Sequence, residues 1–268
     1  MSRPTTNPPL RAVKRAFLIL EILAKRESSA SLTEISEQTQ LDVSTCLRFL
    51  NSLEEIGVVR KDQKSKTFRL GPKLVYFSDK FLRSVNVQDV VKRHLERLVS
   101  ITKETAFYTI RNGDYRVTLF SVESPHNTIA KVNVGLPMAL STGSSGRAIL
   151  SFLPEEEMER YLTKQLSEEF HPRENIKAAE VRKEILKIRT KCYAVRLKEP
   201  FPTSNSVAAP VFDSSGVIGS IAIIGPAERL TSQLCESYGR TLKQVADSLS
   251  EELGCDQVPA RVNYLKRK

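Results

Sequence analysis

The sequence holds few of the residues that build metal centres, with four cysteines and three histidines among 268 residues. The cysteines form no Cys-x-x-Cys pair, and the four are widely spaced: Cys46, Cys192, Cys235 and Cys255. Metal ligands usually come at short, paired spacings, so we expect neither a zinc site nor any other cofactor. The simplest interpretation is four reduced, buried thiols, with redox sensing by one of them as the alternative.

Other signatures are also missing. No apolar run approaches the roughly 18 residues of a membrane span. Residues 1–10 are polar and proline-rich without the apolar core of a signal peptide, so we expect a flexible tail on a cytoplasmic protein without membrane contact. Neither a phosphate-binding P-loop nor Gly-x-Gly-x-x-Gly occurs, and the segment at 143–146 does not match the nucleophile motif Gly-x-Ser-x-Gly. The sequence therefore does not predict an enzyme.

Negative charge is in short supply, because 41 lysines and arginines face 31 acidic residues, a formal net charge of +10. The excess is denser in the first 105 residues than in the rest of the chain. A basic surface favours a polyanionic partner, although charge alone says nothing about the fold.

Residues 11–56 show a helical period. An apolar stripe is expected on a first helix, at Val13, Ala16, Phe17, Leu20, Leu23 and Ala24. Ser31 and Glu34 form a capping-box pattern, which predicts a short second helix from Leu32. Asp42 is a candidate N-cap for a third helix, whose expected buried residues are Val43, Cys46, Leu47, Leu50 and Leu53. Gly57 suits a left-handed helix end.

Two short strands around a polar tip follow within residues 58–71, which is typical of a β-hairpin. Lys61, Lys64 and Lys66 gather near the tip. The order of three helices and a hairpin predicts a winged helix-turn-helix domain over residues 11–72.

The outer face of the third helix carries Ser44, Thr45, Arg48 and Asn51. Arginine can bridge guanine O6 and N7, and asparagine can do the same with adenine, so this face could read bases in a major groove of double-stranded DNA. The lysines of the hairpin would hold phosphates. The alternative is an ordinary solvated helix face.

Residues 73–86 continue as an apolar-striped helix, interpreted as a linker. Symmetric DNA sites require symmetric proteins, so this stripe could be a dimer surface, the alternative being packing on its own chain. Residues 87–256 then mix helices with segments of period two, among them an expected strand at 128–134. This block pattern predicts an α+β domain in which helices flank an antiparallel sheet, before a basic tail at 257–268.

Seven segments together resemble the IclR-type family of bacterial transcriptional regulators across roughly residues 11–254. They are Arg15–Leu23, Ser31–Ile35, Ser44–Leu50, Phe68–Gly71, Gly146–Leu150, Ala208–Asp213 and Ile224–Pro226. The resemblance implies a GAF/PAS-like C-terminal domain that binds a small effector. It further implies a homodimer or homotetramer on a palindromic operator, with the sense of regulation, repressor or activator, left open.

The resemblance also places effector-binding residues in three segments of the second domain. The matching positions are Ser144, Ser145, Arg196, Ser204, Ser206, Ala222 and Ile224. Hydroxyls and free N–H groups before a helix can hold an anion, and a guanidinium binds a carboxylate with two hydrogen bonds. We therefore expect an organic acid as effector. The alternatives are plain N-capping by Ser144 and Ser145, and a surface salt bridge at Arg196.

Two other functions are weighed against regulation. An enzyme would need a nucleophile with a recognisable partner, which the isolated histidines do not provide. A structural nucleic-acid-binding protein without an effector would leave a second domain of roughly 150 residues unexplained.

Overall fold

The computed structural model describes residues 10–26, 28–85, 87–164 and 178–255. It divides into two compact units, one ending at Val85 and the other beginning at Asn86. Apart from Leu10, the expected flexible and basic tails lie outside the described residues.

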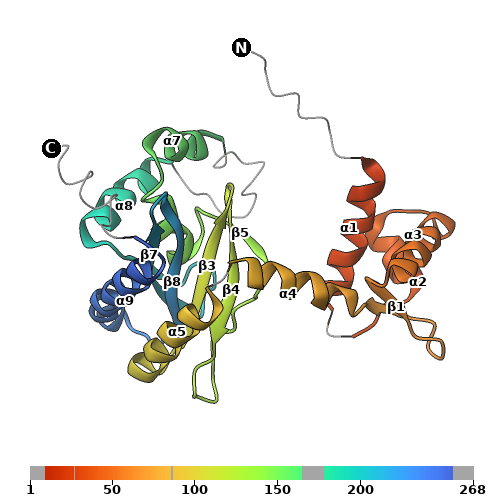
Figure 1. The fold of residues 1–268 in the computed structure, drawn as a ribbon, viewed down its shortest axis with the longest axis horizontal. Coiled ribbons are helices and arrows are strands. Elements are labelled where there is room, and N and C mark those ends of the chain that lie inside the picture. The colour runs from red at the N-terminus through yellow and green to blue at the C-terminus, as the bar shows by residue number, and fades with distance from the viewer. Residues whose placement is uncertain (1–9, 27, 86, 165–177, 256–268) are drawn as a thin grey trace, which may run out of the picture. The chain divides into compact units, whose positions relative to one another are not determined.

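The first unit is three helices, a two-stranded hairpin and a further helix (Figure 1). The elements are α1 (Arg11–Ala24), α2 (Leu32–Thr39), α3 (Val43–Ile56), β1 (Val59–Lys61), β2 (Phe68–Leu70) and α4 (Lys73–Val85). This is the predicted order of a winged helix-turn-helix followed by a linker helix.

Local capping fixes where α2 and α3 begin. The Glu34 N–H donates to the Ser31 hydroxyl at 3.3 Å, and the Ser31 N–H donates back to the Glu34 carboxylate at 2.8 Å. Asp42 caps α3 by accepting the Thr45 N–H at 2.8 Å, and Gly57 ends that helix with φ +89°. The predicted capping box, N-cap and helix end are therefore confirmed.

The core of the first unit contains side chains from α1, α2, α3 and β2, among them Ile19, Ile35, Leu50 and Phe68. Four residues expected in this core are instead exposed: Val13 at 48%, Phe17 at 61%, Val43 at 52%, and Ala24 near the end of α1. The stripe predicted for α1 was therefore partly wrong, because the helix buries the neighbouring Ile19 and Ile22 as well as Leu23. Val43 is the first residue of α3, ahead of the turn that packs on the core.

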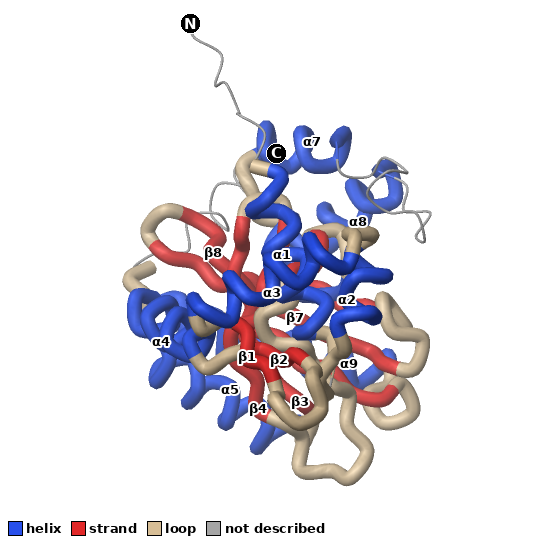
Figure 2. Tube along the Cα trace, turned by 90° about the vertical axis from the view of Figure 1, so that its right-hand side faces the viewer, coloured by secondary structure: helices blue, strands red, loops and turns tan. Residues whose placement is uncertain are grey.

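The hairpin is tied to the helices by a third extended segment. Ala30 exchanges two backbone hydrogen bonds with Phe68, at 2.7 and 2.9 Å. Figure 2 shows β1 and β2 in red beside the blue helices of this unit. The wing is thus anchored at its base, and its tip projects from the paired strands.

The second unit is built on a six-stranded antiparallel sheet with the order β5-β4-β3-β8-β7-β6. Its strands are β3 (Thr105–Asn112), β4 (Tyr115–Val122), β5 (Pro137–Ala139), β6 (Ala194–Leu197), β7 (Ser204–Asp213) and β8 (Gly216–Pro226). Its helices are α5 (Gln88–Thr102), α6 (Gly143–Leu150), α7 (Glu155–Lys164), α8 (Ala178–Lys191) and α9 (Ser232–Glu252). The α+β class with helices flanking an antiparallel sheet is confirmed.

Both faces of the sheet are covered. Ala148 and Phe152, in and after α6, share a core with Phe107, Ala208 and Ala222, which project from one face. Strand residues alternate between faces, so the buried Ile221 and Ile223 point to the other side. There α5 and α9 pack against the strands and against each other (Figure 1).

One predicted strand does not form. Residues 128–134 are irregular, and the strand pairing with β4 is the later β5, through Arg116 and Met138. Ala130 is buried while Val134 is 56% exposed. The alternation of apolar and polar residues in this segment therefore accompanies burial of some side chains, without backbone pairing to a strand.

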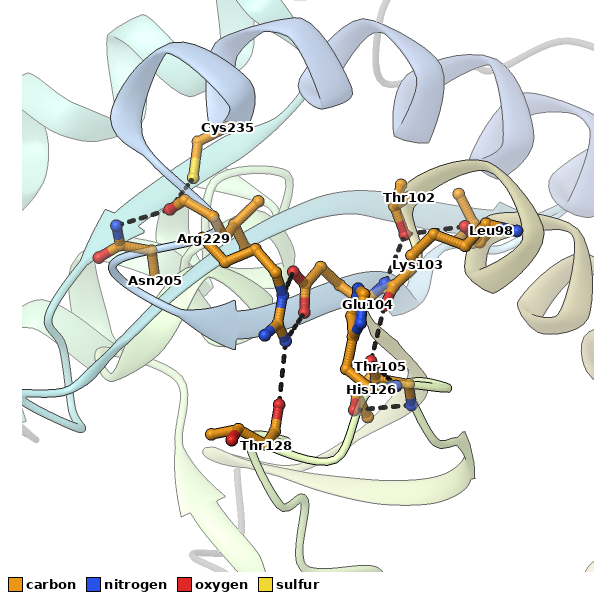
Figure 3. Close-up of polar contacts among 12 residues, drawn as sticks. Leu98, Thr102, Lys103, Glu104, Thr105, His126, Thr128, Asn205, Arg229 and Cys235 are labelled. Carbon is orange, nitrogen blue, oxygen red and sulfur yellow. Dashed lines mark hydrogen bonds and ion pairs between the residues drawn. The ribbon is translucent and has the colours of Figure 1, made fainter.

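A buried ion pair closes one end of the sheet (Figure 3). Glu104 precedes β3 and is 3% exposed, and its carboxylate receives two hydrogen bonds from Arg229, at 2.5 and 2.8 Å. Arg229 also donates to the Thr128 carbonyl at 3.1 Å. The guanidinium therefore ties the irregular segment after β4 to the turn after β8.

Candidate nucleic-acid interface and ligand site

The outer face of α3 presents most of the predicted base-reading residues to solvent. Ser44, Arg48 and Asn51 are exposed and Thr45 is half-buried. The opposite face of the helix is fixed by Cys46, Leu50 and Leu53, which are buried. An apolar stripe on the core and a polar stripe in water leave this face available to a partner.

The start of that face is held by Asp42. Its carboxylate accepts the Ser44 hydroxyl at 2.7 Å and the Thr45 N–H at 2.8 Å. These bonds stabilise the ionised form, the Ser44 hydroxyl first, and lower the pKa of Asp42 to about 2. At neutral pH the ionised Asp42 carboxylate therefore orients the Ser44 hydroxyl, and the Ser44 oxygen can still accept a hydrogen bond from a partner.

The wing carries the three predicted lysines. Lys64 and Lys66 are exposed, while Lys61 is half-buried with its Nζ 5.4 Å from the centre of the Phe68 ring. Asp62 shapes the tip by accepting the N–H groups of Lys64 and Ser65, at 2.8 and 2.9 Å. The Asp62 carboxylate is thus hydrogen-bonded to backbone N–H groups, and the side chains of Lys64 and Lys66 are exposed to solvent.

The sequence reasoning missed two further cations on the wing. Arg60 and Arg69 are both exposed and lie directly opposite each other on β1 and β2. Like charges facing each other across strands repel, and a phosphate between them would relieve the repulsion. The sequence could have predicted this position, because side chains alternate along a strand. Arg60 and Arg69 therefore lie on the face opposite Phe68.

In the second unit, α6 lies on the sheet with its first turn against serines. The Ser144 hydroxyl donates to Ser206 at 2.8 Å, and the Ser145 and Ser220 hydroxyls lie 2.5 Å apart. Strand pairing places Ser206 opposite Ile224, and Ser204 and Ala222 each precede one member of this pair by two residues. The structure therefore brings the predicted residues of these three strand and helix segments together, all of them buried.

Arg196 is engaged in a different way. Its guanidinium forms ion pairs with Glu184, at 2.8 Å, and with Glu199. Glu184 also lies 3.3 Å from Arg147, which is 2% exposed. The salt-bridge alternative is thus what the structure shows for Arg196, with two carboxylates already beside it.

A second buried arginine, which the sequence reasoning missed, is Arg116 on β4, only 6% exposed. Burial lowers the pKa of Arg116 to about 10. The sequence held no clear signal for it, since arginines on strands are ordinarily exposed.

A groove of about 280 Å³ lies elsewhere in this unit, between α5 and β4. Its walls are mostly apolar, and its lining residues are Gln88, Lys92, Leu95, Leu119, Phe120, Ser121, Val122 and Val134. None of the predicted effector-binding residues lines it.

Within the described residues, no group of cysteine, histidine and acidic side chains could hold a metal ion. The four cysteines are buried, and burial raises the pKa of Cys46 and, to about 12, that of Cys235. Those two thiols are thus protonated at neutral pH. Every helix in the described ranges is too short or too polar to serve as a membrane span.

Two sequence families match this chain. Residues 12–63 match the IclR helix-turn-helix domain, and residues 79–251 match the C-terminal domain of bacterial transcriptional regulator IclR. The HTH-type transcriptional repressor AllR of Klebsiella pneumoniae is 27% identical over 252 residues, covering 94% of this chain and 93% of that protein.

Solved structures share the fold. The Thermotoga maritima IclR is 30% identical, with a TM-score of 0.72 over 90% of this chain and 98% of that one. An IclR homolog from Microbacterium hydrocarbonoxydans, complexed with 4-hydroxybenzoate, is 17% identical, with a TM-score of 0.73 over the same shares, 90% and 98%. At that identity the second likeness shows the fold alone.

Proposed function

Because the chain belongs to the IclR family of bacterial transcriptional regulators, we propose that it binds a palindromic operator as a homodimer or homotetramer under effector control. The effector in this proposal is a small organic acid held in the second unit. The AllR relatives are repressors, which supports repression as the direction of control.

The observation that carries the proposal is the division of α3 into two faces. One face is locked in the core by Cys46, Leu50 and Leu53, and the other offers Ser44, Arg48 and Asn51 to solvent. In a winged helix-turn-helix such a helix enters the major groove, where Arg48 and Asn51 would contact base edges.

The wing supplies the part of the affinity that does not depend on sequence. Lys64 and Lys66 at the tip, with Arg60 and Arg69 on the strands, form an exposed basic strip. Contacts to phosphates release counterions and position the protein, whereas base contacts specify the site. Lys61, held over Phe68, is assigned a smaller share.

Effector control needs a ligand that binds two arrangements of the protein with different affinity. The buried residues between α6 and β7–β8, namely Ser144, Ser145, Ser206, Ala222 and Ile224, are the proposed ligand site, with Ser204 at its edge. The structural neighbour that carries 4-hydroxybenzoate supports a carboxylate ligand on this fold. The linker helix α4 would transmit the change.

The test begins with selection of bound sequences from a pool of random duplex DNA, which should yield sites with two-fold symmetry. Arg48→Ala should then lose about 1–3 kcal/mol of discrimination at one base pair of each half-site. Lys64→Ala should weaken binding to all sequences and reduce the salt slope by about 1. Fluorescence anisotropy at several salt concentrations measures both.

The matched control is Lys187→Ala, an exposed lysine of α8 in the second unit, which should change neither quantity. Unchanged discrimination in Arg48→Ala would contradict the assignment of α3 as the recognition helix. Selected sites without symmetry would contradict the palindromic operator.

A further inference from the structure

Among the residues that the structure describes, the buried Arg116 has no carboxylate as a counter-charge. Its side chain projects from β4, it is 6% exposed, and among the described residues its Nε has no hydrogen-bond partner. In the described part of the chain, the hydrogen-bond acceptor for Nη2 is a weak one, the Met138 sulfur at 3.4 Å. Burying an unpaired guanidinium is unfavourable, so an anion that binds beside Arg116 would stabilise the fold.

The buried Arg147 and the half-buried Arg196 of this unit differ in that respect. Arg147 and Arg196 share Glu184, and Arg196 also pairs with Glu199. Arg116 has no carboxylate of the described chain as an ion-pair partner, and burial is the sole cause of its lowered pKa. The single positive charge of Arg116 therefore matches a monoanion.

The guanidinium lies at the start of α6. Its Nη2 is 3.4 Å from the position that a Cβ on Gly143 would occupy, and Gly143 is the first residue of the helix. The N-cap residue Thr142 does not cap this helix with its side chain, because its hydroxyl donates to the Ala139 carbonyl. The helix start adds N–H groups and a partial positive charge to the positive charge of Arg116.

The protein itself shows what this helix end attracts. The Gly143 N–H donates to a Glu199 carboxylate oxygen at 3.4 Å, a long bond. Pro200, next in the chain, lies on the same side, 3.4 Å from the Gly143 Cβ position. A carboxylate of the protein therefore already reaches the helix start beside which Arg116 lies.

We propose that Arg116 and the first turn of α6 bind the carboxylate of a monoanionic organic effector. This rests on the proposed effector function and replaces Arg196 by Arg116 as the group that recognises the acid. The carboxylate takes the guanidinium fork of Arg116 and the N–H groups of Ser144 and Ser145. Met138 and Pro200 offer apolar contacts to the rest of the ligand.

The experiment uses the full-length protein and four pairs of ligands: acetate, glyoxylate, benzoate and 4-hydroxybenzoate, each with its neutral amide. Thermal shift and calorimetric titration should show binding of at least one acid and of none of the amides. Arg116→Met should weaken that binding about 10- to 100-fold, the effect of losing a charge-assisted hydrogen-bond pair. Arg116→Lys should fall between the two.

Stability without ligand supplies an independent readout. Arg116→Met removes an uncompensated charge and should unfold at a higher temperature than the wild type. Arg196→Met is the matched control, because it leaves Glu184 and Glu199 with less compensation and should unfold at a lower temperature.

Equal affinity for an acid in the wild type and Arg116→Met would overturn the proposal, as would failure of all four acids to bind. A lowered unfolding temperature for Arg116→Met would assign the side chain a structural role instead. Operator binding by the wild type, measured separately, decides the proposed function, so the two failures are distinguishable.

Discussion

At the residue scale, Glu34 links the start of α2 to pH. Its carboxylate accepts hydrogen bonds from Arg26, from the Ser31 N–H and from the Ser31 hydroxyl, which together lower its pKa from 4.5 to about 2. The ionised form is thus the one that stabilises the fold, and its contribution is complete above pH 4.5 and lost as the pH falls toward 2. The exposed Glu37 of the same helix offers a comparison.

We expect Glu34→Gln to lower the unfolding temperature at neutral pH, and the difference from the wild type to shrink as the pH falls from 4.5 to about 2. Circular dichroism melts at several pH values measure this. Glu37→Gln should change the melting temperature little. A difference that stayed constant down to pH 2 would show that the Glu34 charge is not responsible.

Arg229 neutralises a buried acid, because the buried Glu104 carboxylate receives two of its three hydrogen bonds. Arg229→Ala should destabilise the protein by about 2 kcal/mol, less than for a fully buried pair because Arg229 is partly exposed. Urea unfolding measures the loss, and Glu228→Ala at the exposed neighbouring position is the control. Adding Glu104→Gln to Arg229→Ala should recover part of the stability; no recovery would argue against an unpaired carboxylate as the cause.

At the scale of elements, α9 depends on a glycine. A Cβ at Gly239 would lie 2.2 Å from the Tyr193 ring, and the Tyr193 hydroxyl donates to Glu236 of the same helix at 2.8 Å. The helix can approach β6 only because this side chain is absent. The Tyr193 ring is held by its hydrogen bond to Glu236 and by Lys191, whose Nζ lies 5.6 Å from the ring centre, so it cannot easily move away.

Gly239→Ala should therefore destabilise the protein by about 1–3 kcal/mol through overpacking, although alanine favours helices. Ser237→Ala, at an exposed position of α9, should be neutral or slightly stabilising. Combining Gly239→Ala with Tyr193→Leu should cost less than the sum of the single changes in urea unfolding. Simple additivity would place the strain elsewhere.

The elements also show what the sequence could predict. The caps at Ser31 and Asp42 depend on residues three positions apart, so local pattern was sufficient. The covered face of α1 and the pairing of residues 128–134 depend on segments distant in sequence, so the predictions for Val13, Phe17 and that strand were wrong. Arg196 and Arg116 could not be told apart, because the acids that neutralise Arg196 include Glu184, on another element.

At the scale of the whole molecule, apolar residues exposed on the first unit bear on assembly. Val75 is 71% exposed, Tyr76 57% and Phe77 50% on α4, besides Phe17 on α1. Exposed apolar residues in such numbers are typical of an interaction surface. A symmetric operator would require two copies of the chain, and we expect this surface to be where they meet.

Phe77→Lys is accordingly expected to shift the protein toward monomer and to weaken operator binding more than tenfold. Sedimentation velocity and anisotropy measure the two effects. Leu186→Lys is the control, since Leu186 is 63% exposed but lies on α8 of the second unit. An unchanged sedimentation coefficient in Phe77→Lys would mean that the copies meet through other residues.

The position of β3 has a consequence for biosynthesis. Its neighbour on one side, β4, follows it directly, but its neighbour on the other side is β8, the last strand described. The first unit is made of consecutive elements and can fold while translation continues, whereas the nascent sheet keeps the buried edge of β3 open until β8 leaves the ribosome. An open strand edge can pair with other chains, so this interval is when the protein most needs a chaperone.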